Sequence, residues 1–172
     1  MKLRLIVGTM TLSAAGLIAI VSHEGYTDNA VVPTKNDRPT YGFGSTFKED
    51  GSPVRIGDRT DPVRALRTVQ AHLSRVENRF RQSLPGVALT QAEYDLYMDW
   101  VYQYGIDAWM KSSMRRELLA GRYPQACDAL LRYRYSGGYD CSATVNGQRN
   151  KVCWGVWERQ IKRHAMCREE QA

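Results

Sequence analysis

Glu24 is the acidic residue whose position in the sequence best suits acid catalysis. It follows an uncharged run, Leu5 to Ser22, which could form a helix packed against the rest of the protein. A carboxyl group beside such an apolar element loses hydration, which raises its pKa and keeps it protonated near neutral pH. Glu24 could therefore act as a general acid, an assignment that depends on the Thr-x-Gly-x-Gly stretch downstream, at residues 40–44. The alternative is a surface glutamate that merely ends a membrane segment.

Other reaction chemistries find little support in the spacing of the residues. The histidines, His23, His72 and His164, are scattered, so neither a metal site nor a cysteine–histidine nucleophile is expected. Ser112 and Ser113 have no base at a recognisable spacing and are interpreted as helix-capping residues. We therefore expect no metal and no cofactor.

The cysteines favour disulfides over a zinc site, because none of them forms a Cys-x-x-Cys pair. There are four of them, Cys127, Cys141, Cys153 and Cys167, which allow three connectivities, and buried free thiols are the alternative. We predict that Cys141 pairs with Cys153, closing the glycine-rich polar loop before the last helix, and that Cys127 pairs with Cys167, joining two helices. We do not expect thiol exchange to act as an activation switch at Glu24, because all four cysteines lie far downstream.

The N-terminal segment, residues 1–22, has the charge pattern of an export signal. Lys2 and Arg4 precede the uncharged run. Glycine, serine and threonine within the run lower its hydrophobicity, so it should insert only weakly into lipid. We expect the segment to insert in a membrane and later to leave it uncleaved. The alternative is a signal peptide cleaved after Ala19 or Ser22, but that cut would leave Glu24 beside a frayed terminus.

The elements that would position Glu24 follow from periodicity and end signals. Residues 40–57 alternate apolar with polar or glycine residues, which predicts a small β-hairpin sheet. Asp61 can cap a long amphipathic helix from Pro62 to about Phe80. A capping box predicts the start of the next helix at Thr90 and Glu93. Further helices are predicted over residues 114–120, 124–135 and 154–167.

These elements indicate one domain over residues 23–172. The fold class is α+β, mainly helical, with a small N-terminal β lobe, a larger helical lobe and a cleft between them. Lysine and arginine outnumber aspartate and glutamate by 24 to 18, which favours a polyanionic partner, although a merely solvated basic face is the alternative. No zinc finger, RNA-recognition signature or basic zipper is present, so nucleic acid is not expected.

Several short motifs occur in an order that a known family shares. His23-Glu24-Gly25-Tyr26 precedes Thr40-Tyr41-Gly42-Phe43-Gly44, and this pair resembles the Glu-Gly and Thr-x-Gly-x-Gly motifs of phage lysozymes, glycoside hydrolase family 24. Later stretches resemble the family's middle and closing helices: Leu89-Thr90-Gln91, Trp100-Val101-Tyr102-Gln103-Tyr104-Gly105, Ser112-Ser113-Met114, Leu119-Ala120-Gly121 and Gly155-Val156-Trp157-Glu158-Arg159. Each motif is short, and the common order makes the resemblance specific. The N-terminal segment resembles that of signal-anchor-release endolysins.

The resemblance implies roles for individual residues, with one departure from the family pattern. Where the family usually places an aspartate, nine residues after the glutamate, this sequence has Pro33, and Thr40 falls one residue late. Asp37 is our first choice for the second carboxylate and Asp28 the second, with a plain loop role as the alternative for both. Thr40 would hold the attacking water. Sugar contacts are implied for Gln103 and Tyr104, and a role in the helix core is the alternative for Tyr104.

The activity implied by the resemblance is hydrolysis of the β-1,4 bond between N-acetylmuramic acid and N-acetylglucosamine in peptidoglycan, causing host cell lysis. The expected setting is export, tethering to the inner membrane and release into the periplasm as a monomer. A lytic transglycosylase is the nearest alternative, because it needs only one carboxyl group. A membrane-tethered module that binds peptidoglycan without cutting it is an alternative of another class.

Overall fold

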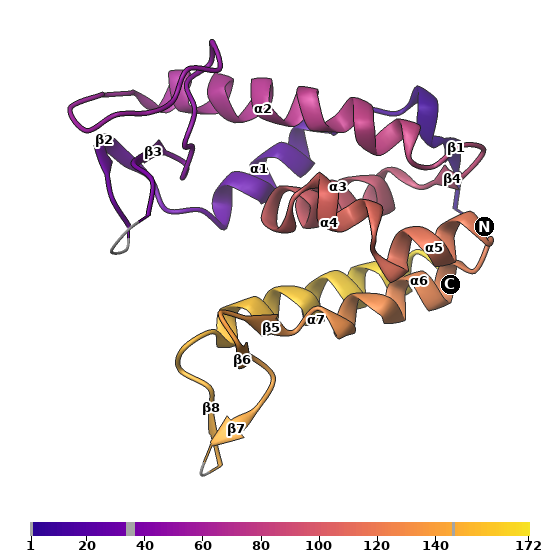
Figure 1. Ribbon diagram of the computed structural model, residues 1–172. Helices are drawn as coiled ribbons and strands as arrows, with labels where there is room; N and C mark the ends of the chain where they lie inside the picture. Colours follow the sequence, from indigo (N-terminus) through magenta and orange to yellow (C-terminus); the bar gives the residue numbers. More distant parts are fainter. Residues whose placement is uncertain (1, 34–36, 146) are drawn as a thin grey trace. The chain divides into compact units, whose positions relative to one another are not determined.

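The computed structural model describes residues 2–33, 37–145 and 147–172, and the chain forms two compact units (Figure 1). Unit 1 comprises Met1–Thr11 with Arg81–Ala172, and unit 2 comprises Leu12–Phe80. Helices dominate the described residues, and the strands are short. The predicted class, α+β and mainly helical, is confirmed.

Unit 2 is built from two helices and a small sheet. Its elements are α1 (Ala14–Ser22), β2 (Thr27–Val31), β3 (Thr40–Gly42) and α2 (Pro62–Gln82), whose last residues extend into unit 1. α1 begins where it does because the Ser13 side chain accepts the backbone N–H of Gly16 at 2.9 Å. α2 has the predicted start, since Asp61 Oδ1 accepts the N–H of Arg64 at 2.9 Å. Its buried face carries Val69, Leu73 and Phe80.

The sheet of unit 2 differs from the hairpin predicted over residues 40–57. β3 pairs with the preceding strand β2 in antiparallel fashion, and residues 43–57 contribute only isolated bridges such as Phe47 with Pro53. The reason is local: Gly44, Gly51 and Gly57 have positive φ, and Pro53 has no N–H to donate to a ladder. β2 escaped prediction because its sequence, TDNAV, has low strand propensity.

Among its described residues, unit 1 holds the remaining helices and three two-stranded antiparallel sheets. Its elements are β1 (Leu5–Ile6), a 3-10 helix (Val7–Thr9), β4 (Ala88–Leu89), α3 (Gln91–Tyr104), α4 (Ile106–Met110), α5 (Ser113–Leu119), α6 (Tyr123–Ala129), a 3-10 turn (Leu130–Arg132), β5 (Tyr135–Ser136), β6 (Tyr139–Asp140), β7 (Thr144–Val145), β8 (Gln148–Arg149) and α7 (Trp154–Glu169). α7 packs on α3 and α6, and α5 packs on α6. α3 and α4 contribute four fully buried aromatic residues to the core of unit 1: Tyr94, Tyr97, Trp100 and Trp109.

Some helix ends in unit 1 agree with those predicted from the sequence, and others do not. The capping box of α3 is present, with Thr90 and Glu93 each bonded to the other's backbone N–H, and Ser112 caps α5 as predicted. The helix predicted over 124–135 is too long: α6 ends at Ala129 and residues 135–140 form a β-hairpin. Gly137 and Gly138 both have positive φ, so they make the two-residue turn that a hairpin favours.

The uncharged N-terminal run is folded in pieces rather than as one helix. Leu5 and Ile6 pair with Leu89 and Ala88 in antiparallel register. Val7 is fully buried, and its N–H donates to Val87 O at 2.9 Å. Within residues 2–33, 37–145 and 147–172, no helix combines the length and apolarity that crossing a bilayer requires.

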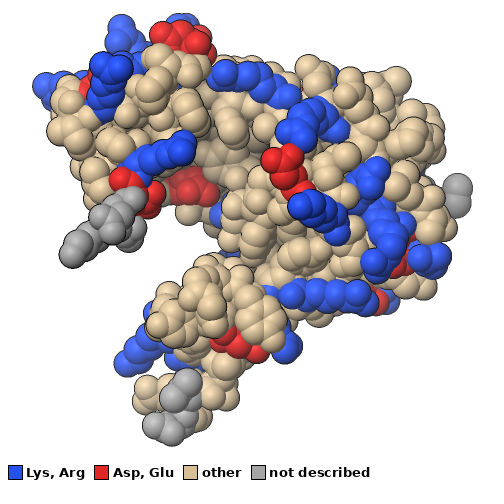
Figure 2. Space-filling model, in the orientation of Figure 1, with Lys and Arg blue, Asp and Glu red and all other residues tan. Residues whose placement is uncertain are grey.

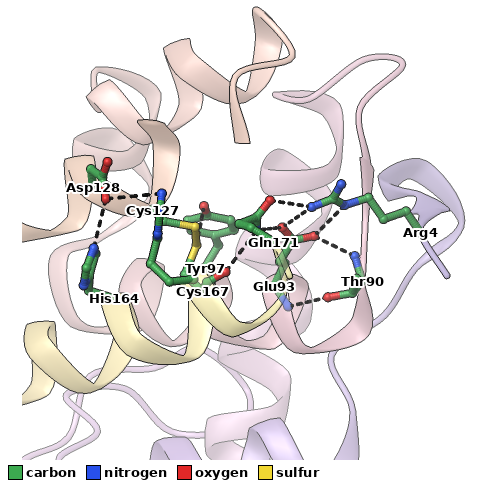
Figure 3. Close-up of a disulfide and its surroundings, with 10 residues drawn as sticks. Arg4, Thr90, Glu93, Tyr97, Cys127, Asp128, His164, Cys167 and Gln171 are labelled. Carbon is green, nitrogen blue, oxygen red and sulfur yellow. Dashed lines mark hydrogen bonds and ion pairs between the residues drawn. A yellow bond between two sulfur atoms is a disulfide. The ribbon is translucent and has the colours of Figure 1, made fainter. Parts of the chain in front are cut away.

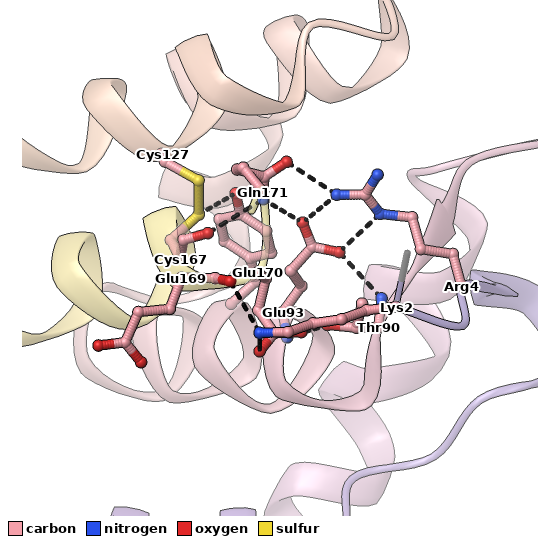
Figure 4. Close-up of polar contacts among 10 residues, drawn as sticks. Lys2, Arg4, Thr90, Glu93, Cys127, Cys167, Glu169, Glu170 and Gln171 are labelled. Carbon is pink, nitrogen blue, oxygen red and sulfur yellow. Dashed lines mark hydrogen bonds and ion pairs between the residues drawn. A yellow bond between two sulfur atoms is a disulfide. The ribbon is translucent and has the colours of Figure 1, made fainter.

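The basic residues ahead of this run join the two ends of unit 1 (Figure 4). The Arg4 guanidinium donates to both carboxylate oxygens of Glu93, at 3.1 and 2.9 Å, and to Gln171 Oε1 at 2.8 Å. Glu93 also accepts the Thr90 N–H, so one buried carboxylate caps α3 and binds the N-terminal strand. Lys2 Nζ forms an ion pair with Glu170 at 2.8 Å. We call this set, Lys2, Arg4, Glu93, Glu170 and Gln171, the N-terminal clasp.

Two disulfides are present, with the predicted pairing: Cys127–Cys167 and Cys141–Cys153. Figure 3 shows the first, which joins α6 to α7 beside Tyr97 and the clasp residue Glu93. Near this bond the His164 ring bonds Asp128 at 3.0 Å, a second link between α6 and α7. The second disulfide closes the segment that carries β7 and β8.

We predict that the two disulfides differ in their contribution to stability. They span 40 and 12 residues. Restricting the unfolded chain by loops of these lengths is worth about 4 and about 3 kcal/mol respectively. In urea denaturation, the Cys127→Ala/Cys167→Ala protein should therefore lose more free energy of unfolding than the Cys141→Ala/Cys153→Ala protein. The reverse order would show that loop length is not what governs the contribution.

Candidate active site

Glu24 lies immediately after α1, as the sequence suggested. Its N–H donates to Val21 O at 3.2 Å, so the residue is tied to the last turn of the helix. Val21 and Ile20 are buried, which fixes this end of α1, and the Glu24 side chain is half-buried. The candidate acid is therefore positioned by packing of the apolar run.

The turn of the Thr-x-Gly-x-Gly motif lies against the Glu24 carboxylate. Tyr41 and Ser45 exchange two backbone hydrogen bonds, at 3.2 and 3.0 Å, and enclose Gly42, Phe43 and Gly44. A Cβ on Gly44 would lie 3.7 Å from Glu24 Oε2. A Cβ on Gly42 would lie only 2.7 Å from the Cβ of Ala65 on α2. Both glycines have positive φ, so the motif needs glycine for backbone conformation, and at Gly42 also for close packing.

Asp28 lies in β2. The helix therefore does not continue past Glu24, as Gly25 suggested. The Tyr26 hydroxyl hydrogen-bonds the Asp28 carboxylate, and the Tyr26 ring packs 5.2 Å from that of Phe43. Loss of hydration, with the hydrogen bond to Asp28, raises the pKa of Tyr26 to about 12. The Tyr26 phenol is therefore protonated near neutral pH and donates its hydrogen bond to the Asp28 carboxylate. Tyr26 is a site residue that sequence reasoning missed, although it adjoins the Glu-Gly pair.

Asp37 and Thr40 lie in unit 2 together with Glu24. Asp37 is exposed, and its Oδ1 accepts the N–H of Arg38 at 2.8 Å. Residues 34–36 of the rebuilt loop lie outside the described residues. Thr40 is half-buried and begins β3 opposite Val31. The catalytic roles assigned to Asp37 and Thr40 remain predictions.

Gln103 and Tyr104 lie at the end of α3 in unit 1, where both take part in a hydrogen-bond network. Arg163 donates to Gln103 Oε1 at 2.7 Å, and Gln160 donates to the Tyr104 hydroxyl at 2.7 Å. The hydroxyl in turn donates to Tyr133 O at 3.2 Å. Burial raises the pKa of Tyr104, although the bond from Gln160 lowers it. Both side chains are half-buried, so part of each remains accessible to a sugar.

The centre of this network is a buried ion pair that sequence reasoning missed. Asp99 on α3 bonds Arg159 and Arg163 on α7, the latter at 2.6 Å. Arg163 is only 3% exposed, and burial lowers its pKa from the usual value. Two arginines four residues apart on one helix face could have signalled a shared acidic partner. The pair fixes α7 against α3 and so holds Gln103 and Tyr104 in place.

The described residues of unit 2 therefore place a candidate acid, the half-buried Glu24, against a glycine turn. Such a carboxyl can donate a proton to a leaving oxygen. Within these same residues, no three His, Cys, Asp or Glu side chains gather closely enough to share a metal ion.

Comparison with known proteins agrees with this geometry. The phage lysozyme family matches residues 21–152. The endolysin of Salmonella phage P22 is 29% identical over 133 residues, which cover 74% of this chain and 86% of the relative. The endolysin of Bacillus phage B103 is 29% identical over 132 residues, covering 75% of this chain but only 48% of that longer protein. The solved structure of an endolysin from Escherichia coli O157:H7 phage FAHEc1 has the same fold, with a TM-score of 0.75, 24% identity and coverage of 92% and 94% of the two chains. The chain belongs to the phage lysozyme family.

Proposed function

We propose that this protein is an endolysin, a muramidase that hydrolyses the β-1,4 bond between N-acetylmuramic acid and N-acetylglucosamine in peptidoglycan and so lyses the host cell. The observation that carries the proposal is the Glu24 carboxylate, held at the end of α1 against the turn at Gly44. Membership of the phage lysozyme family supports it, because the family match includes this region.

In the proposed reaction Glu24 protonates the glycosidic oxygen of the leaving sugar. A second carboxylate removes a proton from a water on the opposite face of the ring, and that water attacks the sugar carbon as the glycosidic bond breaks. Asp37 is our choice for this base, and Thr40 would hold the water. Gln103 and Tyr104 would contact the glycan strand.

We also propose that the protein is first tethered to the inner membrane by residues 5–22 and acts in the periplasm, as a monomer, after release. While the run is in lipid, Lys2 and Arg4 stay on the cytoplasmic side. They cannot then reach Glu93 and Glu170 in the exported part. The N-terminal clasp therefore supports release of the intact chain. A cut near Ser22 would remove β1, α1 and both basic clasp residues.

We predict that Glu24→Gln lowers the rate of wall hydrolysis by about 10³-fold or more, because the amide keeps the shape but supplies no acidic proton. Clearing of a peptidoglycan suspension measures the rate, and circular dichroism checks the fold. Glu169→Gln, at an exposed position on α7, is the matched control and should keep the wild-type rate. A Glu24→Gln protein with most of the wild-type rate would refute the assignment.

We predict that Asp37→Asn loses more than about tenfold in rate, whereas Asp28→Asn loses little. The first change removes the proposed base. The second keeps an oxygen that can accept the Tyr26 hydroxyl. The clearing assay on both variants decides, and the opposite ranking would make Asp28 the second carboxylate.

We predict that the soluble, active periplasmic protein still begins near Met1. Fractionation followed by intact-mass measurement tests this, and a species beginning near His23 would show an ordinary cleaved signal. Gly8→Leu should increase the share in the membrane fraction, because it makes the run more apolar and no atom in the fold lies within 4 Å of the added Cβ. Gly155→Leu, equally unobstructed but outside the run, is the control and should leave the distribution unchanged.

A further inference from the structure

Unit 2 contains a pocket of about 410 Å³ between α2 and the loops that follow β3. This volume is in the range of small-ligand sites. Four basic side chains line it, Lys48, Arg59, Arg64 and Arg67. Basic and acidic groups lie side by side on the surface of the molecule (Figure 2). The question is which of the lining charges already have partners.

Two of the lining carboxylates are used within the protein. Asp58 accepts Lys48 Nζ at 2.9 Å and the Arg55 N–H at 2.8 Å, contacts that hold its pKa below the usual value. Asp50 accepts both the N–H and the hydroxyl of Ser52, which lowers its pKa in the same way. Neither carboxylate is therefore available to neutralise the remaining arginines.

Of the three arginines that line the pocket, two have no partner among the described residues. The exception is Arg64, which forms an ion pair with Asp61 at 3.4 Å. Within residues 2–33, 37–145 and 147–172, the side chains of Arg59 and Arg67 make neither a hydrogen bond nor an ion pair. Arg59 comes from the segment bridged to β2 and Arg67 from α2, so two different elements bring them to one pocket. A pair of guanidinium groups suits a carboxylate, which each can bind through two parallel hydrogen bonds.

Tyr41 adds a hydrogen-bonding group to the pocket. It lines the pocket although only 6% of its surface is exposed. Its hydroxyl makes no hydrogen bond to any residue that the structure describes. A ligand oxygen in the pocket could therefore accept a hydrogen bond from this hydroxyl.

The geometry points to a binding site for the carboxylates of the short peptide that peptidoglycan carries on its muramic acid, an inference that rests on the proposed function. Tyr41 follows Thr40 directly in β3, so the two side chains project from opposite faces of the strand. A tetrapeptide reaches about 13 Å when extended, enough to pass from one face of a narrow sheet to the other. Glu49, a lining carboxylate without a partner among the described residues, would suit the free amine of a diamino acid in the peptide.

The test is calorimetric titration of the Glu24→Gln protein with a muramyl disaccharide tetrapeptide and with the same compound amidated at its carboxyl groups. We expect amidation to weaken binding about tenfold. Arg59→Gln and Arg67→Gln should each weaken binding of the acidic compound about tenfold and leave the amidated one within about twofold, since each removes one charge-assisted pair. Lys162→Gln, which removes an exposed charge on α7, should change neither affinity. Thermal unfolding of each variant checks its fold.

Equal losses for the two compounds, or no loss from either arginine substitution, would overturn the peptide site while leaving the muramidase proposal intact. Displacement of the acidic compound by equimolar inorganic phosphate would indicate a general oxyanion site and overturn the peptide assignment as well. Failure of the protein to bind either disaccharide, together with inactivity of the wild type on cell walls, would instead refute the proposed function itself.

Discussion

Burial of the apolar chain just before Glu24 is the constraint on which the candidate site depends. Ile20 and Val21 are buried, and the Glu24 N–H bonds back to Val21, so the carboxyl is positioned only when α1 is packed into the protein. The same residues have the composition of a membrane signal. Under the proposed tethering, this segment would occupy two environments in turn, and its scattered small and hydroxylated residues would ease its exit from the membrane.

The clasp extends this dependence to the far end of the chain. Glu93 caps α3 and also accepts two hydrogen bonds from Arg4, while Gln171 bonds both residues. The Cys127–Cys167 disulfide fixes the helix from which Gln171 follows. Unit 1 is therefore completed by residues that come from the two ends of the chain. Tethering would thus be expected to weaken unit 1 as well as to misplace Glu24.

The sequence predicted the helices whose starts depend on residues close together in the chain. α2 and α3 were predictable because apolar periodicity and capping residues agree at Asp61 and Thr90. β2 was missed, and the helix predicted to Tyr135 was wrong, because strand pairing across a turn outweighed propensity there. The cysteine pairing was predictable from the elements that the cysteines join. The Asp99 pair with Arg159 and Arg163 was not, since it joins residues 60 or more positions apart. In the site, the position of Glu24 at the end of a packed helix was predictable. Its role as the acid stays a prediction, and no local signal assigned the second carboxylate.

In the proposed mechanism, water activated by a second carboxylate completes the cleavage that Glu24 begins. The most direct measurement is mass spectrometry of the fragments released from purified peptidoglycan, after borohydride reduction of any free reducing ends. We expect fragments that end in reducible N-acetylmuramic acid, because water adds to the sugar carbon. Fragments that end in an anhydro ring and resist reduction would show that the sugar's own hydroxyl replaces water. The protein would then be a lytic transglycosylase and not a hydrolase.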